Sequence, residues 1–125
     1  MVDWSNQFKI RLANNGFHSK SFLKHEVVKL ILVQNILKKY YKKKKRLEIY
    51  TEHPIAETKI ADVYFKNNLT KEVICYEIQK NLSKKWAENT KKIYESKNID
   101  WCLIDLNDLS DNLIILDEQV KEFVI

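Results

Sequence analysis

The stretch KIADVYFKNNLTKEVICYEIQ, residues 59–79, decides the fold of this chain. Its two ends, Lys59–Phe65 and Val73–Gln79, are rich in β-branched and aromatic residues, which favour strands. Between them lies Asn67-Asn68, a pair typical of turns because asparagine tolerates the backbone angles of a chain reversal. The stretch therefore predicts an antiparallel β-hairpin.

The register of this hairpin determines which side chains meet. With Asn68–Lys71 as the loop, Asn67 faces Glu72, and the same register places Asp62 opposite Glu77. Directly opposed side chains have Cβ atoms about 5 Å apart, so two carboxylates placed there repel one another. A divalent cation with oxygen ligands would relieve that repulsion. The open alternative is that both acids are strand-end charges paired with lysines.

On the N-terminal side of the hairpin we expect two helices and a strand. Residues 3–14 are expected to form a short helix, and Ser21 to cap a long helix that extends to about residue 44. Leu47–Tyr50 is a predicted strand, and Pro54 is expected to break the chain after it.

On the C-terminal side we expect a helix and a last strand. Ser83 is expected to cap a helix over about residues 84–97, and Ile99–Leu106 is the predicted strand. Two strands joined through a helix pair in parallel. The whole order predicts one α/β domain over residues 1–125, a layer sandwich with an αβββαβ core and a mixed sheet.

Composition excludes several classes of function. Glycine and proline occur once each, so neither a Walker loop nor a dinucleotide-binding fingerprint can be built. No apolar run is long enough to span a membrane and no signal peptide is present, so we expect a cytoplasmic protein. Cys75 and Cys102 form no Cys-x-x-Cys motif, which disfavours zinc; they are either buried thiols or a disulfide.

A third acid, Glu26, lies in the long expected helix, with Phe22 and Leu30 four residues away on either side. It therefore borders the apolar face. Glu26 either joins the hairpin carboxylates or is a solvated residue paired with Lys29. The adjacent His25 either contacts phosphate and helps to hold the site, or is a packing or surface residue.

The most basic segment of the chain, whose net charge is +5, runs from Lys38 to Arg46. Such a run can neutralise phosphates, and Tyr40 and Tyr41 within it can stack on unpaired bases. The alternative is a solvated helix end, where the helix dipole favours cations. The residues expected to contact nucleic acid are His25, Lys42, Lys43, Lys44, Lys45, Arg46, Lys84 and Lys85.

Together these features resemble the PD-(D/E)XK nuclease superfamily. The resemblance covers about residues 20–106 and is carried, in order, by Lys24–Lys29, Ile60–Val63, Tyr76–Gln79, Ser83 with its helix, and Trp101–Ile104. The Glu-x-Gln ending of the second hairpin strand is similar to that of the nuclease domain of the competence protein CoiA and its relatives.

The resemblance implies a restriction-endonuclease-like fold and a metal-dependent nuclease that acts on DNA more than on RNA. It implies Mg²⁺ or Mn²⁺ held by Asp62, Glu77 and the carbonyl of Ile78, which would activate a water molecule for phosphodiester hydrolysis. The catalytic residues it implies are Glu26, Asp62, Glu77, Gln79 and Lys80. Gln79 would position the attacking water.

The chain departs from the family pattern at two positions. Ala61 stands where the motif has proline, and Gln79 stands where most members have lysine, whose positive charge glutamine cannot carry. Lys80, Lys84 or Lys85 could supply that charge, and the sequence does not choose among them. One alternative is a nuclease-like module that binds nucleic acid without cleaving it; another is an adaptor protein.

A homodimer is also expected, because a two-fold pair would double the basic surface and many members of the family act as dimers. Candidate interface residues are Trp4, Phe8, Tyr40, Tyr41 and the apolar ending Phe123–Ile125. The alternative is that both ends fold back onto the sheet.

Overall fold

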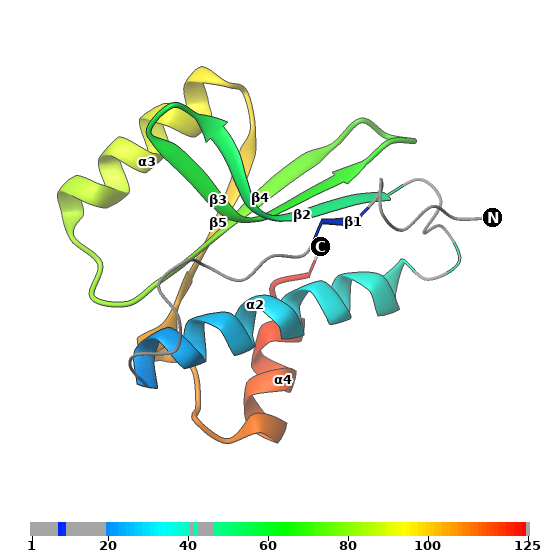
Figure 1. Ribbon diagram of the computed structural model, residues 1–125, viewed down its shortest axis with the longest axis vertical. Helices are drawn as coiled ribbons and strands as arrows, with labels where there is room; N and C mark the ends of the chain where they lie inside the picture. The colour runs from blue at the N-terminus through cyan, green and yellow to red at the C-terminus, as the bar shows by residue number, and fades with distance from the viewer. Residues whose placement is uncertain (1–7, 10–19, 41, 43–46, 125) are drawn as a thin grey trace.

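The computed structural model describes residues 8–9, 20–40, 42 and 47–124. Their elements are β1 (Phe8–Lys9), α2 (Lys20–Lys39), β2 (Leu47–Ala56), β3 (Lys59–Asn67), β4 (Val73–Gln79), α3 (Lys84–Ser96), β5 (Asp100–Asp105), the 3-10 turn η2 (Leu106–Asp108) and α4 (Leu113–Lys121). The strands form one sheet in the order β1-β2-β3-β4-β5 (Figure 1). The predicted α/β class and mixed sheet are confirmed.

Strand pairing follows the expected directions. β2, β3 and β4 are antiparallel neighbours, whereas β5 runs parallel to β4 after the α3 crossover. In the β3–β4 hairpin Val63 pairs with Tyr76, and the N–H of Asn67 donates to the carbonyl of Glu72 at 2.9 Å. The predicted hairpin register is therefore confirmed from the turn as far as Val63.

Helices cover both faces of the sheet (Figure 1). α2 and α4 lie on one face, where Leu32, Ile36 and Ile78 belong to the larger buried core. α3 lies on the opposite face, over a smaller core that includes Cys75 and Tyr94. The sheet between them supplies the strands that carry both hairpin carboxylates.

The prediction of a helix over residues 3–14 is wrong for Phe8 and Lys9, the two residues of that stretch that the structure describes. Phe8 and Lys9 form a short strand that pairs in parallel with Ile49 and Tyr50 of β2; the other residues of that stretch lie outside the described residues. The edge of β2 offers unpaired backbone donors and acceptors, and pairing with β1 satisfies some of them.

The long helix is shorter than expected, because α2 ends at Lys39 and not near residue 44. The run of four lysines that follows Tyr41, Lys42–Lys45, would place like charges close together in a continued helix, where they repel one another. Ser21 does not cap α2, which begins one residue earlier, at Lys20.

Pro54 does not break the chain, because β2 continues through it to Ala56. Proline lacks a backbone N–H and is tolerated on the edge of a sheet. β1 pairs with β2 only at Ile49 and Tyr50, so within the described residues the outer edge of β2 is unpaired at Pro54.

The C-terminal half agrees with expectation. The Ser83 hydroxyl accepts the N–H of Trp86 at 3.1 Å and so caps α3. Cys75 and Cys102 are free thiols, Cys75 buried and Cys102 half-buried, so the disulfide alternative is wrong. Among the described residues, no helix has both the length and the apolar character needed to cross a membrane.

Candidate active site

Asp62 lies where the sheet is irregular. The strand ladders on both sides of β3 omit it, and facing it on β2 Glu52 has a φ of 51°, a left-handed angle uncommon for glutamate. Ala61 packs in the core on the α3 side of the sheet, and Val63 packs in the core on the α2 side. Residues two apart in a regular strand point to the same side, so the alternation of β3 is broken at Asp62, where the strand changes face. The Asp62 carboxylate accepts the backbone N–H of Ile78 at 2.7 Å.

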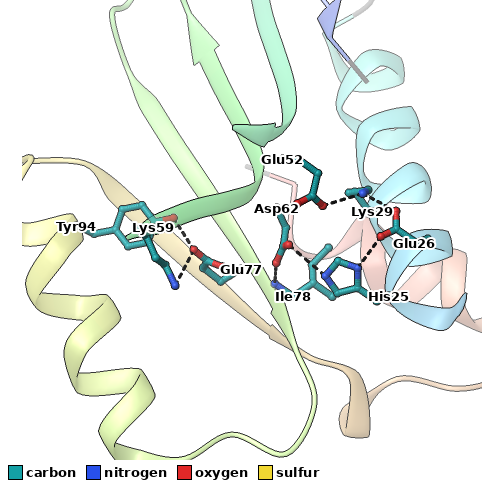
Figure 2. Close-up of polar contacts among 9 residues, drawn as sticks. All are labelled: His25, Glu26, Lys29, Glu52, Lys59, Asp62, Glu77, Ile78 and Tyr94. Atoms are coloured by element: carbon teal, nitrogen blue, oxygen red, sulfur yellow. Dashed lines mark hydrogen bonds and ion pairs between the residues drawn. The ribbon is translucent and has the colours of Figure 1, made fainter. Parts of the chain in front are cut away.

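His25 connects Asp62 with α2. Its Nε2 lies 3.1 Å from Oδ1 of Asp62, and its Nδ1 lies 3.3 Å from Oε1 of Glu26 (Figure 2). Burial lowers the pKa of His25, but the hydrogen bond with Asp62 and the charges of both carboxylates outweigh it, so the pKa is raised. This arrangement favours the imidazolium form, in which both ring nitrogens donate.

Glu26 belongs to this cluster and is not a solvated edge residue. It is 1% exposed and forms an ion pair with Lys29, which is itself fully buried. The Lys29 ammonium also lies 2.9 Å from Oε1 of Glu52 (Figure 2). Lys29 therefore ties α2 to the irregular position of β2 that faces Asp62.

Glu77 has a separate set of partners on the side of α3. Its Oε1 accepts the hydroxyl of Tyr94 at 2.7 Å and lies 3.2 Å from the Lys59 ammonium (Figure 2). Burial raises the pKa of Glu77 to about 7, with a further contribution from the charge of Asp62, although the hydrogen bonds from Tyr94 and Lys59 oppose the rise. The alternative in which the hairpin acids pair with lysines is confirmed for Glu77, whereas Asp62 pairs with His25. Sequence reasoning did not name Lys59 or Tyr94 as the partners of Glu77.

The carboxylates of Asp62 and Glu77 do not point at each other as expected. Figure 2 shows Asp62 turned towards α2 and Glu77 turned towards α3. The change of face at Asp62 explains the difference, because a regular strand would have placed both on one side. The two charges still interact, since Asp62 contributes to the raised pKa of Glu77.

The remaining expected site residues lie around these clusters. Gln79 is half-buried at the end of β4, where it pairs with Asp105 of β5. The side chains of Lys42, Lys80, Lys84 and Lys85 are exposed. Lys43, Lys44, Lys45 and Arg46 lie outside the described residues.

The donor set suits a hard divalent cation, although it is sparse. Across the described residues, no three His, Cys, Asp or Glu side chains converge on one metal position. Mg²⁺ is commonly held by one or two carboxylates, with waters and substrate phosphates completing its shell. With His25 as imidazolium, the two clusters hold four carboxylates against three cationic groups, so ionisation of Glu77 leaves an excess of one negative charge, which a cation would offset.

Comparisons with protein-family models, with curated proteins and with solved structures found no match to this chain.

Proposed function

We propose that the chain is a metal-dependent nuclease that hydrolyses phosphodiester bonds in nucleic acid, DNA more than RNA. The observation that carries the proposal is the position of two buried, electrically coupled carboxylates, Asp62 and Glu77, on neighbouring central strands of an αβββαβ core. Their order and spacing resemble the PD-(D/E)XK signature, whose core has the same order of elements. A buried carboxylate whose pKa is raised by burial and by a neighbouring charge, as in Glu77, is typical of functional sites.

In this proposal Asp62, Glu77 and the carbonyl of Ile78 hold Mg²⁺ or Mn²⁺. When bound, the metal supplies Lewis acidity and lowers the pKa of a coordinated water. His25 orients Asp62, and Tyr94 orients Glu77. Gln79 positions the attacking water through its amide. Glu26 acts through His25 and keeps that ring oriented.

The distribution of lysines supports a polyanionic substrate. The net charge is +5, and Lys84, Lys85, Lys91 and Lys92 are exposed on α3, the helix beside Glu77. Contacts of this kind position a phosphate backbone and make binding weaken as salt rises.

A cleavage panel tests this function. Labelled DNA and RNA, as single strands, duplexes and junctions, are incubated with Mg²⁺ or Mn²⁺. We expect cleavage by the wild type and at least about a hundredfold loss in Asp62→Asn and Glu77→Gln, which remove ligand charge at nearly constant volume. Glu88→Gln, the same substitution at an exposed position of α3, is the matched control and should cleave normally. Full activity in both site variants would refute the assignment.

The second candidate is a module that binds nucleic acid without cleaving it. Protein donors already hydrogen-bond both carboxylates, since Asp62 accepts from Ile78 and Glu77 accepts from Tyr94. Gln79 also lacks the charge of the usual lysine. Salt-sensitive binding by the wild type, with no metal-dependent cleavage of any substrate in the panel, would favour this alternative.

A further inference from the structure

Lys59 is a buried lysine whose ammonium contacts Glu77, an environment that the sequence did not predict. It begins β3, only 9% of it is exposed, and its ammonium lies 3.2 Å from Oε1 of Glu77. The same ammonium donates to the Thr90 hydroxyl at 3.0 Å and lies 4.4 Å from the centre of the Trp86 ring. Thr90 and Trp86 belong to α3, so a helix and two strands enclose this charge.

The lysines that follow Gln79 in the sequence have a different environment. Lys80, Lys84 and Lys85 are exposed, whereas the ammonium of Lys59 contacts a buried carboxylate directly. An exposed ammonium is screened by water and interacts weakly with a buried group. Among these four lysines, the geometry therefore favours Lys59 as the one whose ammonium acts on Glu77.

We propose that Lys59 is a positioning residue that orients Glu77 for metal binding and places beside it the positive charge that Gln79 lacks. This inference rests on the proposed nuclease function. Both Lys59 and Tyr94 contact the same oxygen, Oε1, so the other carboxylate oxygen of Glu77 is the one assigned to the metal. Thr90 and Trp86 fix the ammonium, and through it the carboxylate.

A contribution to folding alone does not account for this arrangement. Burying two charges costs desolvation energy that their attraction often fails to offset, so a buried ion pair adds little to stability compared with apolar residues of similar size. By contrast, groups that orient a metal ligand commonly change metal affinity or activity by about 10–100-fold when they are removed.

Mn²⁺ titration of the full chain by calorimetry, together with cleavage assays, tests the inference. Lys59→Met keeps the length of the side chain and removes its charge; we expect both Mn²⁺ affinity and cleavage rate to fall about 10–100-fold. Lys59→Arg should recover at least about tenfold of both losses, because it returns a cation that can contact and orient Glu77. Lys59→Met combined with Gln79→Lys should recover at least about tenfold of the lost cleavage rate alone, because a lysine at position 79 returns the charge without the contact that orients Glu77. Lys66→Met on the same strand is the matched control and should bind Mn²⁺ normally.

The outcomes separate the possible failures. Wild-type Mn²⁺ affinity in Lys59→Met, or no recovery in either rescue variant, would overturn the role of Lys59. Mn²⁺ binding by the wild type without cleavage would overturn the nuclease function alone, and no Mn²⁺ binding would overturn both. If Lys59→Met does not fold, Thr90→Val replaces it, because it removes the hydroxyl that orients the ammonium; unchanged Mn²⁺ affinity there would contradict the inference.

Discussion

At the scale of single residues, the carboxylate of Glu77 is ionised at an electrostatic cost that its partners only partly offset. It is almost fully buried and lies close enough to Asp62 to feel its charge, and Tyr94 and Lys59 only partly offset these two effects. Its pKa of about 7 lies above the ordinary value of 4.5. The folded protein therefore binds this proton more tightly than the unfolded chain does. That contribution to stability is complete below about pH 4.5 and is lost as pH rises through about 7.

We predict that, with chelator present, wild-type stability falls between pH 5 and pH 8 more steeply than that of Glu77→Gln. The difference should be on the order of 3 kcal/mol, because one pKa unit corresponds to about 1.4 kcal/mol. Urea unfolding at both pH values measures it. Glutamine at position 77 cannot titrate, so the variant isolates this group from His25. Parallel pH profiles for the two proteins would contradict the raised pKa.

At the scale of elements, the turn between β3 and β4 sets the hairpin register. The Asn67 side chain accepts the N–H of Leu69 at 3.0 Å, and the Asn67 carbonyl accepts the N–H of Lys71 at 2.7 Å. Lys71 has a φ of 66°, the left-handed conformation that glycine adopts without steric cost. The turn thus brings β4 into register with β3, and the strained residue Lys71 lies at the end of the turn.

We predict that Lys71→Gly stabilises the protein by about 0.5–1 kcal/mol. Relief of the left-handed strain, worth about 1–2 kcal/mol, exceeds the added freedom of the unfolded chain. The midpoint of urea unfolding measures the change. Lys91→Gly, an exposed position in the helical conformation of α3, should instead lose about 1 kcal/mol. A loss of stability in both variants would count against a left-handed conformation at Lys71.

At the scale of the whole molecule, the expected interface residues that are described lie against the core. Tyr40 packs on Phe65 with ring centres 5.3 Å apart, and Phe123 packs against the larger core. Trp4 and Tyr41 lie outside the described residues, as does the side chain of Phe8. Three of the exposed large apolar side chains among the described residues are consecutive in the first turn of α4, namely Leu113, Ile114 and Ile115. Three adjacent exposed aliphatic residues favour a contact surface.

We predict that the chain forms a dimer through this turn of α4. Light scattering at micromolar concentration and moderate salt should give about twice the mass of one 15.0 kDa chain. Ile114→Glu should give the single-chain mass without unfolding, because Ile114 is 80% exposed. Leu69→Glu, at an exposed leucine in the β3–β4 turn, is the control and should remain dimeric. A single-chain mass for the wild type, unchanged on adding nucleic acid, would rule the dimer out.

The sequence by itself determined the types of most elements, their order and the hairpin register. These features depend on local causes: the alternation in Val73–Gln79, the turn chemistry of Asn67 and the capping hydroxyl of Ser83. Local patterns also placed Asp62 and Glu77 on neighbouring strands. The predicted ends of α2 and β2 were wrong, because the periodicity of apolar residues does not define where an element ends. Repulsion among lysines disfavours continuing α2, and the unpaired sheet edge lets β2 continue through Pro54.

Only the tertiary structure decided which way each carboxylate turns and which groups meet it. Strand alternation predicts side-chain direction only while the strand is regular. Opposite Glu52, with its positive φ, β3 changes face at Asp62, which sends that carboxylate towards α2. Lys59 and Tyr94 meet Glu77 through packing of α3 on the sheet. Such contacts join residues far apart in the chain, and their geometry depends on packing that no local sequence pattern encodes.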